Sequence, residues 1–168
     1  MPRIYVKTVR VAADAVDVHG HVNNQDYLRW MEEIAVEHSA SQGWPMERYL
    51  SAGASWYVRA HAIEYLRPAM PRDDIAVYTW IAGMSERTSP RRTLFVRLAE
   101  RRQILARAET LWTFVDMATG RSVRISDEVR SAFEIVDSED EVLRLAGLHR
   151  FEPARRAGNS RESRANSV

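Results

Sequence analysis

The sequence predicts an α+β fold in which one long helix lies on a curved antiparallel sheet, with two such chains forming a dimer. A length of 168 residues suits a single domain, and the 45% hydrophobic and 28% charged fractions are near the globular average. One N-terminal stretch has helical periodicity, and most of the following hundred or so residues are rich in β-branched and aromatic side chains. Because one helix covers only one sheet face, the other face is expected to be wet or to meet a second subunit.

The N-terminal part is expected to form a strand, a loop and the long helix. Apolar and polar residues alternate over residues 4–11, which predicts a strand. After a polar loop, apolar residues recur at three- and four-residue steps over 24–42, which predicts the helix. Asn23 or Asn24 supplies its N-cap, and Gly43 ends it.

The rest of the chain is mostly β. A short helical turn at 46–50 precedes four expected strands in meander order. These strands are expected at 56–66, 75–82, 93–100 and 104–115. A further short strand fits residues 123–125, and the capping box Ser-Glu-Asp-Glu at 138–141 predicts a short helix ending at Gly147.

The domain organisation expected is a folded domain over 1–137, a C-terminal helix segment over 138–150 and a basic tail over 151–168. The chain carries a net charge of +1, which argues against nucleic acid as a partner, and the tail is interpreted as a solvated, flexible end. The absence of cysteine excludes disulfides, thiolate zinc sites and a cysteine nucleophile. The sequence has no membrane-length apolar run and no signal-peptide core. We therefore expect a cytoplasmic location and no membrane partner.

The densest group of functional side chains lies between the first strand and the long helix. It reads Asp17-Val-His19-Gly20-His21-Val-Asn23-Asn24. A helix start offers unpaired backbone N–H groups and the positive end of the dipole, and a carboxylate opposite such donors suits acyl transfer. The alternative is a loop in which the Asp and Asn residues only make turns and caps and Gly20 adopts positive φ.

This stretch resembles the active-site signature of hotdog-fold acyl-CoA thioesterases of the 4-hydroxybenzoyl-CoA thioesterase type. It is also similar to the Asp…His-Val-Asn-Asn stretch of plant acyl-ACP thioesterases. The similarity extends over about 7–133 and includes Glu-Tyr-Leu-Arg-Pro-Ala at 64–69 and Trp-Thr-Phe-Val-Asp at 112–116. Two positions depart from it: Ala15 stands where many relatives have a second Asp, and His19 where the acyl-ACP branch has Asn.

The resemblance implies roles for individual residues. Asp17 would attack the thioester carbon or activate a water molecule, and the backbone N–H at Asn24 would polarise the carbonyl. His21 would orient Asp17 or that water, and Tyr27 would line the acyl pocket. The substrate-binding residues implied are Gly20, Asn23, Tyr27, Arg91 and Arg92.

Arg91 and Arg92 resemble the family's arginine pair that holds the phosphates of coenzyme A. They are expected in the connector after Pro90, where forked guanidinium groups suit that task. The alternative is two solvated loop arginines.

Other polar and aromatic residues are interpreted as structural. His19 and His21 lack a clear third ligand for a metal, since Asp17 is already assigned to acyl transfer. Solvent-facing helix carboxylates are expected at Glu33 and Glu37, and packed, hydrogen-bonded histidines at His38 and His61. Core or interface positions are expected for Trp30, Trp56, Trp80 and Trp112, with one or two lining an acyl tunnel.

The function expected from the resemblance is hydrolysis of an acyl-CoA thioester to free acid and CoA, with no cofactor or metal. The partners expected are the acyl-CoA substrate and the chain itself, as a homodimer that could pair into a tetramer. One alternative is an acyl-CoA-binding protein without turnover. Another is a hotdog hydratase or dehydratase, although the Gly-Asp-x-Asn-Pro-x-x-His setting of those enzymes is absent.

Overall fold

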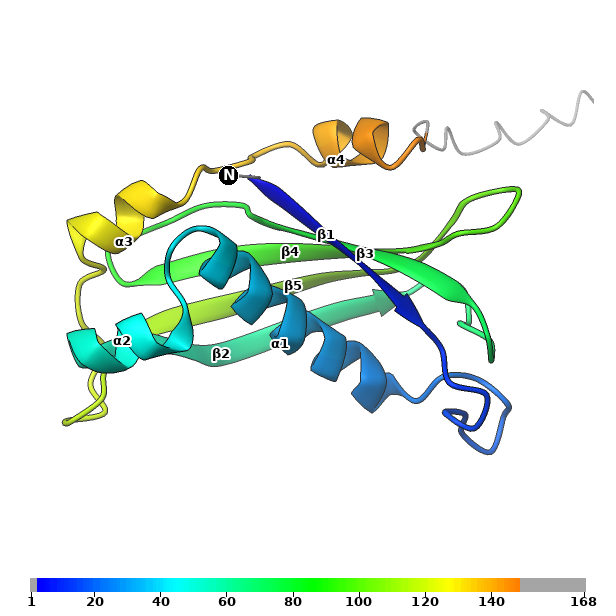
Figure 1. Cartoon of the computed structure of the whole chain (residues 1–168), viewed down its shortest axis with the longest axis horizontal. Coiled ribbons are helices and arrows are strands. Elements are labelled where there is room, and N and C mark those ends of the chain that lie inside the picture. Colours follow the sequence, from blue (N-terminus) through cyan, green and yellow to red (C-terminus); the bar gives the residue numbers. More distant parts are fainter. Residues whose placement is uncertain (1–2, 149–168) are drawn as a thin grey trace, which may run out of the picture.

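The computed structural model describes residues 3–148, which form one antiparallel sheet with four helices (Figure 1). In chain order the elements are β1 (Ile4–Arg10), α1 (Asn24–Ser41), α2 (Met46–Ala52), β2 (Ala54–Tyr65), β3 (Asp74–Ile81), β4 (Thr88–Arg97), β5 (Gln103–Asp116), α3 (Asp127–Ala132) and α4 (Glu139–Leu145). The predicted α+β class and antiparallel sheet are confirmed. The tail expected at 151–168 lies outside the described residues.

The five strands are ordered β1-β3-β4-β5-β2, and all neighbours are antiparallel. The meander prediction is right for β3, β4 and β5 but wrong for β2, which pairs with β5 instead of β3. The physical reason is the connection through α1 and α2, which carries the chain from β1 to the opposite edge of the sheet. β1 and β2 are therefore the edge strands.

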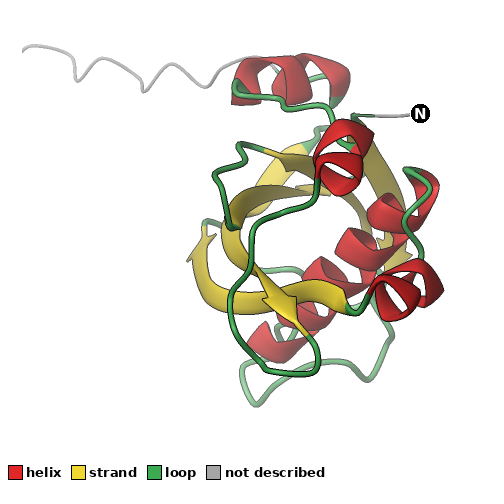
Figure 2. Cartoon of the chain, turned by 90° about the vertical axis from the view of Figure 1, so that its left-hand side faces the viewer, coloured by secondary structure: helices red, strands yellow, loops and turns green. Residues whose placement is uncertain are grey.

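Helix α1 packs its apolar face on the concave side of the sheet (Figure 2). Its start is capped by the side chain of Asn23, and the chain turns away at Gly43, which has a φ of 83°. Buried α1 residues at three- and four-residue steps meet the inward-facing residues of β3, β4 and β5. The main members of this core are Tyr27, Trp30, Met31, Ile34, Ile75, Val77, Phe95, Leu105 and Ala106.

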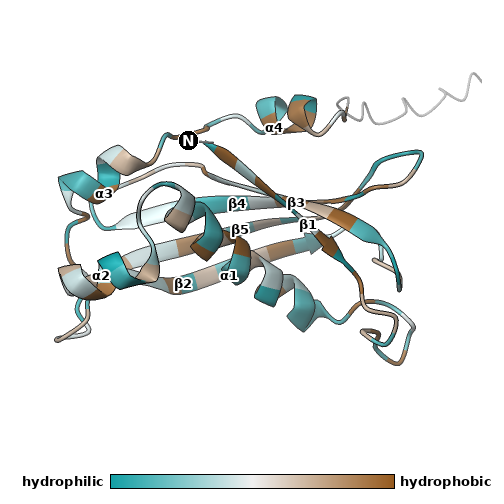
Figure 3. Cartoon of the chain, viewed as in Figure 1, coloured by the Kyte–Doolittle hydropathy of each residue, from teal (hydrophilic) through white to brown (hydrophobic). Residues whose placement is uncertain are grey.

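Helix α4 covers part of the opposite face. Val142 and Leu143 pack on Tyr78 and Trp80, which alternate with the inward-facing residues of β3. Both hydrophilic and hydrophobic segments are visible along α4 in Figure 3. The expectation that this face is covered only by water or a second subunit is thus wrong over β3 and β4, where the chain covers its own sheet.

The structure corrects three further details. The strand expected at 123–125 is absent, and one isolated bridge at Ser122 stands there instead. Helix α3 follows it, capped by Ser126, and the sequence patterns did not predict this helix, which is only six residues long. β4 begins at Thr88, five residues before the predicted start at Thr93, because Pro90 lies inside the strand.

Within the described part of the chain, no helix is long and apolar enough to span a membrane.

Candidate active site

The loop between β1 and α1 forms a tight turn at Asp17. A bridge between Val16 and Val22 closes its base, and the Asp17 N–H donates to the His21 carbonyl at 2.7 Å. Inside the turn the Gly20 N–H donates to the Asp17 carbonyl at 3.0 Å, with Gly20 at a φ of 75°. Only glycine adopts this conformation without strain, so Gly20 has the positive φ that the alternative interpretation of this loop predicted.

The Asp17 carboxylate is held by the amides of its own turn. Its Oδ1 accepts hydrogen bonds from the N–H of His19 at 2.8 Å and of His21 at 3.2 Å. The His19 bond, followed by the His21 bond, lowers the pKa of Asp17 below its ordinary value of 3.8. The side chain is exposed, and no residue within 3–148 donates to Oδ2. One carboxylate oxygen is therefore fixed, and the other is available to a substrate or water.

Helix α1 begins three residues after this turn and leaves one N–H unused. Asn23 Oδ1 accepts from the Gln25 N–H at 3.0 Å, and the Asn23 carbonyl accepts from the Asp26 N–H at 3.0 Å. The Asn24 N–H meets no acceptor among the residues that the structure describes. A free N–H at the positive end of a helix is the kind of donor that stabilises an oxyanion.

The histidines contact Asp17 through their backbone. The His21 contact expected from the sequence is made by its N–H, while the imidazoles of His19 and His21 are exposed and donate no hydrogen bond to Asp17. Among residues 3–148 no group of three or more His, Cys, Asp or Glu side chains is arranged to hold a metal ion.

Tyr27 lies on the buried face of α1, in the core between the helix and the sheet. Its ring makes edge-to-face contacts with Trp30, Tyr65 and Phe95, at centroid distances of 5.5, 5.2 and 5.0 Å. Burial raises the pKa of the Tyr27 hydroxyl to about 12, so it does not exchange protons near neutral pH. The arrangement suits a packing role.

Arg91 and Arg92 lie on β4, so the expected connector location is wrong. Successive strand residues point to opposite faces, and only Arg91 points to the concave side. Arg91 is buried, and its Nη1 donates to His38 Nδ1 at 2.8 Å and to Thr79 Oγ1 at 3.4 Å. Arg92 is exposed and paired with Glu109 at 3.0 Å. The two guanidinium groups cannot hold one phosphate together.

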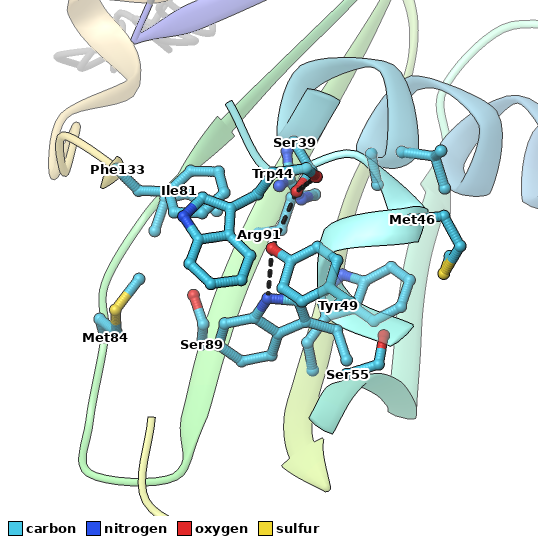
Figure 4. Close-up of a pocket in the computed structure, with 14 residues that line it drawn as sticks. Ser39, Trp44, Met46, Tyr49, Ser55, Ile81, Met84, Ser89, Arg91 and Phe133 are labelled. Atoms are coloured by element: carbon cyan, nitrogen blue, oxygen red, sulfur yellow. Dashed lines mark hydrogen bonds between the residues drawn. The ribbon is translucent and has the colours of Figure 1, made fainter. Parts of the chain in front are cut away.

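Arg91 borders a pocket between the second half of α1, α2 and the concave face of the sheet (Figure 4). The pocket contains about 580 Å³ of empty space, part of it open to solvent. Its lining residues are Ala35, Val36, Ser39, Trp44, Met46, Tyr49, Ser55, Trp56, Ile81, Met84, Ser89, Arg91, Trp112 and Phe133. The sequence did not predict this pocket, although strand alternation through Thr93 and Phe95 would have placed Arg91 on the same face.

The structure also places the remaining polar and aromatic residues. Glu33 and Glu37 on α1 were expected to face solvent, but both are half-buried and form ion pairs with Lys7 of β1. His38 is buried against Arg91, and His61 Nδ1 lies 2.9 Å from Thr110 Oγ1. Trp30 and Trp80 are core residues, whereas Trp56 and Trp112 line the pocket.

Comparison with solved structures shows the same fold in acyl-CoA thioesterases. A mutant of 4-hydroxybenzoyl-CoA thioesterase, complexed with 4-hydroxybenzoyl-CoA, superposes with a TM-score of 0.73 at 16% identity, over 79% of this chain and 100% of that one. A 1,4-dihydroxy-2-naphthoyl-CoA thioesterase from Synechocystis superposes with a TM-score of 0.68 at 19% identity, over 77% of this chain and 94% of that one. A hypothetical protein from Staphylococcus aureus in complex with CoA superposes with a TM-score of 0.70 at 13% identity, over 77% of this chain and 80% of that one.

Sequence comparison gives the family. No curated protein matches the chain. The family model of the thioesterase-like superfamily matches residues 11–133, which include the Asp17 turn, α1 and all strands except β1. The structural relatives have the hotdog fold, which is the fold that the resemblance of the Asp17 motif implied. With most of its length matched by this one model, the chain belongs to the thioesterase-like superfamily.

Proposed function

We propose that the protein hydrolyses acyl-CoA thioesters, with Asp17 as nucleophile or general base. The observation that carries this proposal is the Asp17 carboxylate, which is exposed and ionised, with Oδ1 held by two amides and Oδ2 without a donor within residues 3–148. Membership of the thioesterase-like superfamily supports thioester hydrolysis. The relatives named as 4-hydroxybenzoyl-CoA and 1,4-dihydroxy-2-naphthoyl-CoA thioesterases support CoA as the thiol.

The mechanism uses groups of this chain alone. The thioester carbonyl oxygen accepts a hydrogen bond from the Asn24 N–H, which stabilises the negative charge of the tetrahedral intermediate. In one route Asp17 Oδ2 attacks the carbonyl carbon, the C–S bond breaks, and water hydrolyses the resulting anhydride. In the other, Asp17 takes a proton from water while the water oxygen attacks. Both routes release the free acid and CoA, whose thiolate takes up a proton.

The neighbouring residues have supporting roles in this proposal. Gly20 permits the turn that aims Asp17, Asn23 caps the helix that carries the oxyanion donor, and the exposed imidazole of His21 borders the reacting groups. Tyr27 packs behind this region and fixes α1 on the sheet. Arg92 is the exposed member of the arginine pair and is the one that could reach a CoA phosphate.

The active unit is proposed to be a homodimer. β2 is a long edge strand whose Tyr57 and Val58 are 48% and 37% exposed, and a second copy of β2 would satisfy its unpaired backbone groups. Such pairing would join two sheets into one.

Comparison of the native protein with Asp17→Asn tests the catalytic role. The asparagine carbonyl can still accept from the His19 and His21 amides, so the turn and the melting temperature are expected to persist. Without an ionisable carboxylate, kcat for thiol release from a panel of acyl-CoAs should fall about 10²- to 10⁴-fold. Asp14→Asn is the matched control, because Asp14 is an exposed carboxylate of the same loop.

Acyl-CoA binding without turnover is the second candidate function. It is favoured by the turn itself, because the hydrogen bonds of Asp17 would suffice to explain an aspartate there. Native protein that binds acyl-CoA and releases no thiol from any member of the panel would replace the hydrolase proposal with this one.

A further inference from the structure

The pocket beside Arg91 contains a hydrogen-bond chain whose donors are all used. The Ser39 hydroxyl donates to the Trp44 carbonyl at 2.9 Å, so its single proton is taken. The Tyr49 hydroxyl, 2.9 Å from Ser39 Oγ, must therefore donate to it and accept from Trp56 Nε1–H at 3.1 Å. Figure 4 shows this chain along one side of the pocket. Ser39, Tyr49 and Trp56 thus form a rigid wall with no donor left for a ligand.

Unlike these three residues, Arg91 carries a charge, which is buried without a counter-ion among the described residues. It is 6% exposed, and the hydrogen bonds that it makes are those to His38 and Thr79, both neutral acceptors. No carboxylate among residues 3–148 forms an ion pair with it. Burial lowers the pKa of Arg91 to about 10, so the group remains protonated at neutral pH. A buried charge is normally neutralised by a partner of opposite sign.

Trp112, which lines the same pocket, carries a buried donor, Nε1, without an acceptor among the described residues. Arg91 pairs with Thr110 across β4 and β5, which makes Trp112 the diagonal neighbour of Arg91 on the same face. The Cα atoms of such diagonal neighbours lie roughly 7–8 Å apart. One small anion between them could contact both.

Apart from Ser55 and Ser89, the remaining lining is apolar, and the pocket opens to solvent. Trp44, Ile81 and Phe133 are buried, whereas Val36 of α1 and Met46 of α2 are each 45% exposed and mark the entrance. The empty space of about 580 Å³ includes solvent at the open entrance, and the enclosed part, about 70 Å³, suits only a small ligand. An occupant must therefore combine a small anionic end with an apolar body.

We propose that this pocket binds a small organic acid, whose carboxylate lies against Arg91 and the Trp112 indole and whose apolar body lies among the aromatic residues. A carboxylate accepts two parallel bonds from a guanidinium group and has lone pairs left for an indole N–H. Along α1, Ser39 of the pocket is about 22 Å from Asn24 at 1.5 Å per residue. Within one chain, an acid in the pocket is therefore a ligand additional to a thioester at Asp17.

Calorimetric titration of the full chain without CoA tests this site. The probes are phenylacetate and phenylacetamide, which have the same shape and differ in charge. Native protein should bind phenylacetate about 10- to 100-fold more tightly than the amide, the ratio expected for a charge-assisted contact. Arg91→Met should remove that preference, whereas Arg92→Met, which changes the next residue on the opposite face, should keep it.

Two further variants keep the result decisive. Trp112→Phe keeps the ring and removes the N–H, and should weaken phenylacetate binding about 3- to 10-fold without affecting the amide. If Arg91→Met fails to fold, the Trp112→Phe variant alone tests whether the pocket binds the acid. Asp17→Asn should bind phenylacetate as the native protein does, which separates this site from the hydrolase proposal. Equal affinity for acid and amide, absence of binding, or an equal loss in Arg92→Met and Arg91→Met would overturn the proposal.

Discussion

Asp17 and Arg91 are charged residues held in opposite ways. Backbone amides surround one oxygen of Asp17 while solvent reaches the other, so the carboxylate is positioned without being neutralised. Arg91 is enclosed by side chains and keeps its charge against the cost of burial. Under the two proposals, the carboxylate of Asp17 acts on a carbonyl carbon and the guanidinium group of Arg91 binds an anion.

The pH dependence of hydrolysis follows from the environment of Asp17. Its amide hydrogen bonds lower its pKa below 3.8, so the carboxylate is fully ionised well below neutral pH. We expect kcat/KM to be constant between about pH 5 and pH 8 and to fall only under more acidic conditions. A rate profile with a steep rise near pH 6.5, the ordinary pKa of histidine, would instead assign the base to His21.

The lowered pKa of Asp17 also determines how this residue affects stability as the pH changes. The folded-state pKa lies below the unfolded value, so the stabilising contribution is present above pH 3.8 and is lost as the pH falls through the folded pKa. Acid unfolding should therefore begin at a higher pH in Asp17→Ala than in the native protein, as followed by circular dichroism. Identical acid transitions would show that the turn bonds add nothing to stability.

At the scale of elements, α4 decides how much of the sheet the chain covers by itself. Arg107 of β5 pairs with Glu139, and the Arg102 side chain donates to the Ala146 carbonyl, so polar contacts hold both ends of the helix. Its buried residues complete a core on the outer face of β3 and β4. A second subunit would therefore have to contact the sheet elsewhere.

The packing of α4 can be measured with a matched pair of leucines. Leu143 is 6% exposed and Leu145 is 57% exposed, two residues apart on the same helix. Leu143→Ala should lower the free energy of unfolding by about 2–5 kcal/mol, because it leaves a cavity against the sheet. Leu145→Ala should change it by less than about 0.5 kcal/mol. Urea denaturation distinguishes the two, and equal losses would contradict the packing of α4.

At the scale of the whole molecule, the strand order determines where a second copy can bind. β1 and β2 are the edges, and β2 is the longer, with 12 residues against 7. Several successive β2 residues are exposed, and Tyr57 and Val58 are apolar among them. A long, unpaired apolar edge favours strand pairing between copies.

Sedimentation equilibrium of edge variants tests this arrangement. The native chain is expected to be a dimer, and Val58→Lys should shift it toward monomer at micromolar concentration. Val6→Lys is the control, because Val6 is 42% exposed on the opposite edge strand. Dissociation by Val6→Lys in place of Val58→Lys would move the interface to β1.

Local patterns predicted most of the elements and the turn at the candidate site. Helical spacing and capping residues located α1 and α4 to within a few residues, because these signals depend on neighbours in the chain. The motif around Gly20 predicted the turn that presents Asp17, since its hydrogen bonds join residues at most four apart. The family resemblance rested on the same contiguous stretch.

Only the tertiary structure decided which distant residues meet. Arg91 was expected in the connector after Pro90, but it lies buried on β4, because β4 starts before Pro90 and α1 covers that face. The pairing of β2 with β5 and the covering of β3 by α4 likewise depend on contacts between residues far apart in sequence. Such contacts are selected by the burial of apolar surface over the whole domain, which no local pattern records.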